Sequence, residues 1–494
     1  MKHLQSIISG SVSLILVLAV GSVNTCSGRE PAKAEIAVLS KTAESLQQEH
    51  IKDMQEKFNG RAEYRRMQNA VTMNPINELA MNREIFAGMT ETFSHKLDDW
   101  AVTNQKRTGR CWMFAGMNLL RVGAMKKMNL KNFEFSQSYI FFWDKIERSN
   151  YFLESIIDTA ERPDGDRTVD CILADSLGDG GQWSMFVSLI KKYGLVPKVA
   201  MPESNSSSNS KMMNKILRAK LHEGAKRLRD MHSQGATISR LRSAKREILT
   251  VIYRILSIHM GTPPEKFDWQ WRDKDDEFHR DGTLTPQEFA GKYLSLDLDE
   301  YVCLVHDPRP NSPIGRTFTV AYLGNVVGSE PIKYLNVDIK LIKEITMRTL
   351  LDGEPVWFGC DVSKQMDRDL GLWDNNLFDY EGIYDTRFTL QKADRLIYHQ
   401  SRMTHAMLLT GVDVVDGKPR RWRVENSWGE DVGKKGFFIM NDSWFDEYVF
   451  EIGARKSYLP ENLRKAWEQE PIIFPPWDPM GSLARQEILL DSRS

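Results

Sequence analysis

Four residues of this chain could together cleave an amide bond through a covalent thioester. Cys111 would be the nucleophile, and His405 would be the base that takes its proton. Asn426 would orient the imidazole, and Gln105 would donate a hydrogen bond to the oxyanion of the reacting carbonyl. The four occur in the stretches Gln105-Lys-Arg-Thr-Gly-Arg-Cys111-Trp112, Met403-Thr-His405-Ala and Glu425-Asn426-Ser427-Trp428-Gly429.

Cys111 begins a predicted helix over residues 111–128. The helix is indicated by an apolar stripe with steps of four, three, four and four, which consists of Met113, Met117, Leu120, Ala124 and Met128. The N-terminus of a helix favours an anion, so we expect the thiol pKa to be lowered there, and further by an imidazolium partner. A lone cysteine is more commonly structural and buried. Gln105, six residues earlier, and Trp112, directly after, favour the nucleophile.

His405 and Asn426 are predicted to lie on neighbouring strands. The segment 405–415 is strand-like, Asp416-Gly417 is a tight-turn signal, and residues 421–426 form a second strand. Antiparallel pairing about this turn would bring Asn426 roughly opposite His405, where the amide oxygen can fix the imidazole tautomer. Trp428 could shield this bond from water. His399 lacks any such surroundings and is an internal control.

A second candidate segment contains two consecutive glycines. Gly180 and Gly181 lie in Ser176-Leu-Gly-Asp-Gly-Gly-Gln-Trp183. Glycines allow the backbone to approach a substrate peptide closely, although a Gly-Gly pair is often only a turn. Their place between Cys111 and the central part of the chain keeps both interpretations open.

Length and composition bound the class of protein. The chain has 494 residues, 41% of them hydrophobic and 10% aromatic, which is enough for two or three domains with a large core. The formal net charge of -1 gives no global support for binding nucleic acid. Five cysteines are too few and too scattered for a disulfide framework. No CxxC pair suggests structural zinc, and the proposed chemistry requires no metal or other cofactor.

Residues 1–25 are typical of an export signal. Lys2 and His3 precede a short apolar core at residues 11–20, which is too short to span a bilayer comfortably. A buried N-terminal helix is the alternative. Cys26 stands where a bacterial lipoprotein carries its acylated cysteine, but Thr25 is a poor residue to precede it. Lipidation and simple cleavage both remain open, and either predicts an exported protein, periplasmic or anchored to the outer membrane.

The rest of the chain divides into five regions by pattern. We predict a helical extension at 26–66, a helical lobe at 67–204, an insertion at 205–340, a β lobe at 341–470 and a tail at 471–494. A polar loop is expected at 204–210 and helices over 211–261. Strands are expected at 301–305, 317–323, 356–360 and 437–440. Aromatic residues at 139–143 are expected in the core. Asp273-Lys-Asp-Asp-Glu-Phe278 faintly resembles a calcium loop, but Phe278 occupies the glycine position, so a solvated acidic face is favoured.

The Gln-x5-Cys-Trp, His and Asn-Ser-Trp-Gly set resembles that of the papain-like cysteine peptidases. The separation of Cys111 and His405 is 405 − 111 = 294 residues, against roughly 130–150 in ordinary members. The excess fits an insertion at 205–340.

A narrower resemblance is to the bleomycin hydrolase and bacterial aminopeptidase C group. Three further stretches are similar to that group, and the similarity runs from about residue 70 to residue 484. They are Phe135-Ser-Gln-Ser-Tyr-Ile-Phe-Phe-Trp-Asp-Lys145, Tyr193-Gly-Leu-Val-Pro197 and Trp477-Asp-Pro-Met-Gly-Ser-Leu-Ala484.

The resemblance implies an α+β, two-lobed papain-like fold with helical and hook-like insertions, assembled as a homohexameric barrel. It implies aminopeptidase action on peptides with a free N-terminus, with hydrolysis of bleomycin as a side activity. In that group the C-terminal tail lies in the cleft, so Ala484 joins Gly180, Gly181 and Trp428 as expected substrate-binding residues.

Two features depart from the group. Its members are usually cytosolic, whereas residues 1–25 predict export. They usually end near Ala484, whereas this chain continues through residues 485–494, which we expect to be removed in the active enzyme. The alternatives are a cysteine endopeptidase or acyltransferase with an open cleft and, least favoured, a binding protein on an inactive peptidase scaffold.

Overall fold

The computed structural model describes residues 44–485, and its chain separates into two units, Met1–Arg66 and Met67–Ser494. The described part of the first unit contains α1 (Gln48–Asn59) and the beginning of α2 (Ala62–Val71). The predictions for residues 1–25 and for Cys26 lie outside the described residues. All that follows concerns the second unit.

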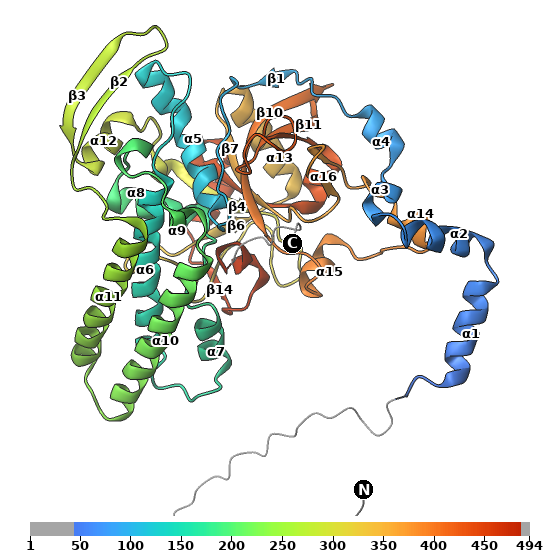
Figure 1. Cartoon of the computed structure of the whole chain (residues 1–494), viewed down its shortest axis with the longest axis horizontal. Coiled ribbons are helices and arrows are strands. Elements are labelled where there is room, and N and C mark those ends of the chain that lie inside the picture. Colours follow the sequence, from blue (N-terminus) through green and yellow to red (C-terminus); the bar gives the residue numbers. More distant parts are fainter. Residues whose placement is uncertain (1–43, 486–494) are drawn as a thin grey trace, which may run out of the picture. The chain divides into compact units, whose positions relative to one another are not determined.

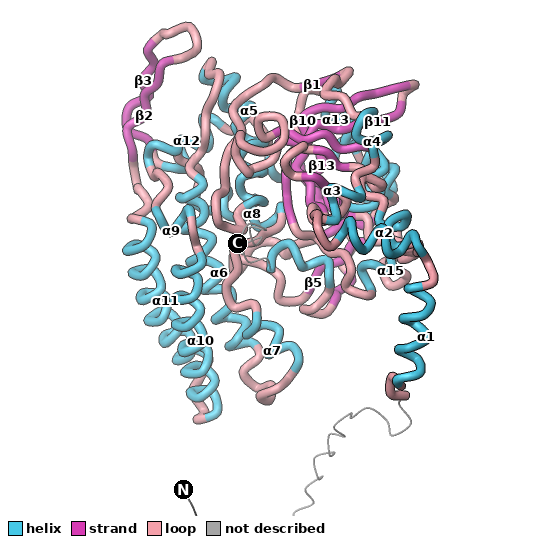
Figure 2. The backbone as a smooth tube through the Cα atoms, turned by 45° about the vertical axis from the view of Figure 1, so that its right-hand side comes forward, coloured by secondary structure: helices cyan, strands magenta, loops and turns pink. Residues whose placement is uncertain are grey.

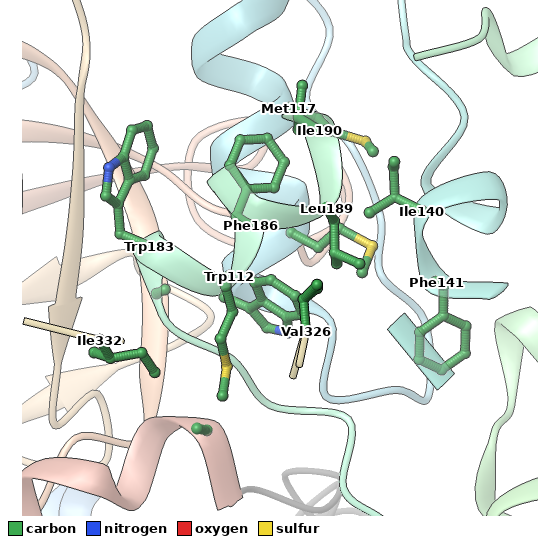
Figure 3. Close-up of a cluster of buried hydrophobic side chains, with 14 of the residues drawn as sticks. Trp112, Met117, Ile140, Phe141, Trp183, Phe186, Leu189, Ile190, Val326 and Ile332 are labelled. Carbon is green, nitrogen blue, oxygen red and sulfur yellow. The ribbon is translucent and has the colours of Figure 1, made fainter. Parts of the chain in front are cut away.

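A central buried helix organises the helical lobe. This helix, α5 (Cys111–Met128), has the predicted bounds and is buried on nearly all sides, so its apolar stripe is only part of its buried surface. It packs against α6 (Gln137–Asp158) and α8 (Trp183–Tyr193). Figure 3 shows Trp112 and Met117 of α5 among side chains of α6 and α8. This packing fixes the beginning of α5, where Cys111 lies.

Two long antiparallel helices extend the lobe beyond α6. They are α10 (Lys211–Ser233) and α11 (Ile238–Met260), and both run beside α6 (Figure 1). The expected polar loop at 204–210 instead contains a short helix, α9 (Asn205–Ser208). The Ser204 hydroxyl caps it by accepting from the backbone N–H of Ser207, and Ser207 and Ser210 are buried. Serines in this run cap and pack, which a low-complexity composition does not reveal.

A hairpin and a short helix follow α11. The strands β2 (Phe267–Arg272) and β3 (Phe278–Leu284) pair only with each other, and α12 (Pro286–Tyr293) follows them. Trp269 packs edge-on against Phe289 of α12, which attaches the hairpin to the helical lobe.

The β lobe is built on one mixed sheet of twelve strands, with the order β14-β5-β6-β4-β13-β7-β10-β11-β12-β9-β8 and β1 paired to β10. Figure 2 shows its strands gathered apart from helices α6, α10 and α11. The strands β4 (Tyr301–Val305), β5 (Thr317–Val320) and β6 (Tyr334–Asn336) belong to this sheet, because β4 pairs with β13 (Val449–Arg455). The segment from β4 onward, predicted as part of the insertion, is therefore structurally part of the β lobe.

The central strands carry the predicted turn. β7 (Val356–Cys360) and β10 (His405–Val415) have the predicted bounds, β11 spans Lys418–Glu425 and β12 spans Phe437–Asn441. Between β10 and β11, Asp416 and Gly417 have φ values of 50° and 74°, as a two-residue hairpin turn requires. Leu408 of β10 faces Glu425 of β11, so the residue after Glu425 lies near the beginning of β10.

The remaining elements are four strands of the sheet and the helices and turns elsewhere in the second unit. They are α3 (Ile76–Ala80), α4 (Arg83–Gly88), β1 (His95–Lys96), α7 (Arg167–Ala174), α13 (Ile339–Leu351), β8 (Met366–Asp367), β9 (Leu372–Trp373), α14 (Tyr380–Tyr384), α15 (Lys392–Ile397), α16 (Asp442–Tyr448), α17 (Glu461–Trp467), β14 (Ile472–Phe474) and 3-10 turns η1 (Lys198–Ala200), η2 (Leu298–Glu300), η3 (Lys456–Tyr458) and η4 (Pro479–Arg485). Within residues 44–485, none of the helices has both the length and the apolar character needed to span a bilayer.

Candidate active site

The thiol of Cys111 lies at the junction of the two lobes. Cys111 is the first residue of α5, and its sulfur faces the backbone N–H of Ala406 on β10. Ala406 directly follows His405, so the structure brings together two residues that are 294 positions apart. Cys111 and His405 are only 1% and 0% exposed, respectively, so both are almost fully removed from solvent.

Asn426 fixes the imidazole of His405. The distance between His405 Nε2 and Asn426 Oδ1 is 2.9 Å, and the backbone N–H of Ser427 donates to the same Oδ1 over 2.8 Å. An atom that accepts from Ser427 is the amide oxygen, so Nε2 carries the imidazole hydrogen. The neutral ring then presents an unprotonated Nδ1, which is buried and has no hydrogen-bond partner among the described residues. That nitrogen is available to take a proton.

Burial controls the protonation of this pair. Burial raises the pKa of Cys111 to about 11, although the backbone N–H groups of Ala406, Trp112 and Cys111 favour the thiolate. Burial also lowers the pKa of His405 to about 4, and the hydrogen bond to Asn426 only partly opposes this. The expected lowering of the thiol pKa is therefore not found in this closed site. The reason is that the helix N-terminus favours the anion less than removal from water disfavours it.

Gln105 links the loop before α5 to the segment that follows β11. Its Oε1 accepts from Ser427 Oγ over 2.7 Å, and its backbone N–H donates to the Ser427 carbonyl over 2.8 Å. Its Nε2 donates to the Thr108 carbonyl over 2.6 Å. An amide nitrogen has two hydrogens, so one remains that can donate to an oxyanion.

Trp428 contacts the imidazole directly. Its ring stacks on that of His405, with the centroids 5.0 Å apart. The guanidinium carbon of Arg368 lies 5.1 Å from the Trp428 centroid. The predicted shielding of the imidazole thus has a structural basis, and the expected substrate contact remains a prediction.

Gly180 and Gly181 are buried beside the nucleophile. A Cβ added to Gly181 would lie 2.3 Å from the indole of Trp112, and the Gly180 carbonyl accepts from the Arg148 guanidinium. Only a glycine allows position 181 to pack against Trp112. Gly181 therefore has a packing function and the Gly180 carbonyl a hydrogen-bonding one, and a direct role of either glycine in substrate binding remains a prediction.

The end of the described chain lies against the same region. A Cβ built on Gly359 of β7 would lie 3.3 Å from Leu483 Cδ2, and Ser482 Oγ donates to the Met403 carbonyl over 2.9 Å. The Ala484 carbonyl accepts from Arg148 Nη1 over 3.3 Å. The tail through Arg485 is thus packed among segments that carry His405 and the two glycines. Residues 486–494 lie outside the described chain.

A buried hydrogen-bond network beside the site was not predicted from the sequence. The buried carboxylate of Glu425, directly before Asn426, accepts from Arg121 Nη2 at 2.7 Å and from Asn118 Nδ2 at 2.8 Å. It also accepts from Trp100 Nε1 at 2.6 Å. These contacts tie α5 to the end of β11. The available signal for this network was the presence of Asn118 and Arg121 in the middle of α5, among mostly apolar residues.

The acidic turn at Asp273 is part of the β2–β3 hairpin. Asp273 accepts from His279 Nε2 at 3.0 Å, from Asn129 Nδ2 at 3.1 Å and from the backbone N–H groups of Asp275 and Glu277. Through these hydrogen bonds the Asp273 carboxylate holds the turn together and connects it to Asn129.

The fold and the residues at the lobe junction define a papain-like cysteine peptidase. The Peptidase C1-like family matches residues 45–481 of the chain, and the chain therefore belongs to that family. This result agrees with the residues Cys111, His405 and Asn426 standing at one junction.

Similar proteins include aminopeptidases C, bleomycin hydrolases and a protein named PepW. Aminopeptidase C of Lactobacillus delbrueckii subsp. lactis is 43% identical over 419 residues, covering 84% of this chain and 93% of its own. The bleomycin hydrolase of Gallus gallus is 43% identical over 428 residues, covering 85% and 94%. The crystal structure of PepW from Lactobacillus rhamnosis is 44% identical, with a TM-score of 0.87, and the match covers 88% of this chain and 99% of PepW. The resemblance to the bleomycin hydrolase and aminopeptidase C group is confirmed.

Proposed function

We propose that this chain is a cysteine aminopeptidase, which removes residues from the free N-terminus of peptides through a thioester on Cys111. The observation that carries the proposal is the junction of α5 and β10, where the Cys111 sulfur faces Ala406 and the adjacent His405 is held by Asn426 at 2.9 Å. The relatives named aminopeptidase C support the exopeptidase action.

The roles of the four residues follow from their chemistry. His405 Nδ1 takes the thiol proton, and the Cys111 thiolate attacks the scissile carbonyl to form a carbon–sulfur bond. The Cys111 N–H and the remaining Gln105 amide hydrogen stabilise the oxyanion. The His405 imidazolium then protonates the leaving amine as the carbon–nitrogen bond breaks. Neutral His405 next takes a proton from water, whose oxygen replaces sulfur, and the proton returns to the thiolate.

The tail favours exopeptidase over endopeptidase action. Met480, Leu483 and Ala484 are buried, and Gln182 Nε2, directly after the two glycines, donates to the Met480 carbonyl at 3.4 Å. A tail packed at this site would leave little room for a substrate with several residues on the N-terminal side of the scissile bond, and would leave its C-terminal side free to extend. An endopeptidase or an acyltransferase requires a longer open cleft.

Two peptides that differ only at the N-terminus test the proposal. We expect the purified protein to release the first residue of a free-amine peptide and to leave its N-acetylated form intact. Cys111→Ala should abolish release, whereas Cys171→Ala, at a half-buried thiol outside the site, should retain it. Equal cleavage of both peptides inside the chain would favour the endopeptidase. Activity retained by Cys111→Ala would refute the thiol mechanism.

Export and assembly complete the proposal. The pattern of residues 1–25 supports export of the protein, with Cys26 as the candidate for lipidation. The resemblance to bleomycin hydrolase supports assembly as a homohexamer. Intact mass of the protein from membrane and periplasmic fractions distinguishes lipidation from simple cleavage. Light scattering of the purified protein measures the assembly, and a monomeric active enzyme would rule out the hexamer.

A further inference from the structure

A buried carboxylate lies directly beside the loop that carries the nucleophile. Asp179 is 0% exposed and accepts four hydrogen bonds from three parts of the chain, namely the loop before α5, helix α6 and the beginning of α10. Oδ1 accepts from Lys145 Nζ of α6 at 2.6 Å and from Asn214 Nδ2 of α10 at 2.7 Å. Oδ2 accepts from the Gly109 backbone N–H at 3.1 Å and from Ser210 Oγ at 2.5 Å. Each of the two carboxylate oxygens therefore accepts two hydrogen bonds.

The same residue reaches both sides of Cys111. Gly109 precedes the nucleophile by two positions, and Trp112, which follows it, donates from Nε1 to the Asp179 carbonyl at 2.8 Å. Asp179 also lies two positions before Gly181, against which the Trp112 ring packs. Asp179 therefore connects the nucleophile loop with the glycine segment.

We infer that Asp179 is a positioning residue that sets the place of the Cys111 loop, with the Lys145 ammonium as its fixed counter-charge. The inference rests on the proposed thiol mechanism. The four described cysteines, Cys111, Cys171, Cys303 and Cys360, are all free, so the contacts of Asp179 hold these segments without a disulfide. Lys145 also donates to the Gly178 carbonyl at 2.6 Å, which holds the segment from its other side.

The pair also has an electrostatic effect on the nucleophile. Burial is the main cause of the raised pKa of Cys111, and the negative charge of Asp179 acts in the same direction. Although burial alone would raise it, the Lys145 ammonium and the hydrogen bonds hold the pKa of Asp179 below its ordinary value. The Lys145 ammonium carries the opposite charge, so we expect it to favour the Cys111 thiolate.

The other charged groups around the pair and the thiol are themselves paired or neutral. Arg148 pairs with Asp144 at 2.7 Å on α6, and Arg110 makes two contacts of 3.0 Å with Glu203. Facing the thiol from the β lobe are His405 and the buried Cys360 thiol.

Three variants separate a positioning role from a merely structural one: Asp179→Asn, Lys145→Met and the double variant. The readout is the pH profile of Cys111 alkylation by iodoacetamide, followed by mass mapping of the Cys111 peptide. We expect Asp179→Asn to move the profile to lower pH and Lys145→Met to move it to higher pH, each by about half a pH unit. The double variant has neither charge of this pair, so its profile should return close to that of the parent. A double variant that folds and reacts normally also shows that a defect in a single variant arises from the charge left unpaired.

Kinetics on a free-amine peptide provide the second readout. A displaced nucleophile loop should lower kcat about tenfold or more in Asp179→Asn with little change in KM, because small misplacements of reacting groups are costly. Glu154→Gln is the control, since Glu154 lies on α6, the helix that carries Lys145, and pairs with Lys245 away from the site. It should change neither the profile nor kcat.

Shifts in the same direction for both single variants, or no shifts, would overturn the inference. Peptidase activity retained by the Cys111→Ala variant would instead refute the proposed function. The failure of the inference and the failure of the proposed function are thus distinguishable.

Discussion

The indole of Trp428 stacks on the imidazole of His405, with the ring centroids 5.0 Å apart and the ring planes inclined by 29°. The stack covers one face of the ring whose Nε2 donates to Asn426. Water that reached this hydrogen bond would compete for Asn426 and loosen the imidazole. The stack therefore ties the orientation of the base to a side chain that performs no proton transfer.

We predict that Trp428→Ala lowers kcat about tenfold, because an imidazole that is no longer held loses general acid–base efficiency. Trp428→Phe keeps a ring at the position and should recover most of the rate. Steady-state kinetics on one free-amine peptide measure both variants. Equal rates for Trp428→Ala and the parent would show that the stack does not contribute.

Asn426 has a second, separable contribution. Asn426→Ala removes the acceptor that selects the imidazole tautomer, so we expect kcat to fall by about 10² while KM changes little. His399→Asn is the matched control, since His399 is exposed and its φ of 57° suits asparagine. The control should retain full activity. A fall in the control comparable with that of Asn426→Ala would mean that the loss is not specific to the site.

Gly181 is predicted to tolerate no side chain. In Gly181→Ala the new methyl group would lie 2.3 Å from the Trp112 ring, so the ring or the backbone must shift. We expect a loss of about 1–3 kcal/mol in the free energy of unfolding and a larger relative loss of activity. Denaturant unfolding and peptide kinetics measure the two effects.

Gly291→Ala is the control for that substitution. Gly291 lies in α12 with open space around it, so alanine there should leave stability unchanged or slightly raised. An unchanged Gly181→Ala protein would contradict the close packing of Trp112.

Glu451 makes stability depend on pH. This residue of β13 is fully buried, and burial raises its pKa to about 8. Between pH 4.5 and 8 the folded state therefore holds a proton that the unfolded state has lost, so the free energy of unfolding falls as the pH rises. The contribution is complete below the ordinary carboxyl pKa and is lost as the pH rises through about 8.

Glu451→Gln isolates this contribution, because glutamine has the shape of the protonated side chain and does not ionise. We expect similar melting temperatures for parent and variant near pH 5 and a more stable variant near pH 9, by on the order of 4 kcal/mol. Thermal unfolding across this range is the measurement. Parallel curves for the two proteins would contradict a neutral Glu451 in the folded state.

The local elements around the site were largely readable from their patterns. α5 has its predicted bounds because apolar spacing marks a helix that packs on its neighbours. β10 begins at His405 as predicted, and the turn at Asp416 and Gly417 uses the positive φ values that these residue types tolerate. The pairing of Asn426 with His405 follows from that turn, because a short hairpin sets the register of its own strands.

The pairing of strands that are far apart in the chain could not be predicted from the sequence. β4, β5 and β6 join the main sheet through β13, whose residues lie far along the chain, so their local pattern could not separate them from the insertion. The buried serines at 207 and 210 were hidden by a loop-like composition.

Residue types and short-range order in the chain were sufficient to name Cys111, His405, Asn426 and Gln105 and to place three of them at element boundaries. The protonation states of these residues, and the buried residues that hold them in place, depend on the tertiary structure. Glu425 contacts Arg121, 304 positions away in the chain, and Asp179 contacts Lys145 of α6, and both pairs are buried. The reason is that burial and charge pairing depend on what surrounds a group in space, which no local stretch of sequence contains.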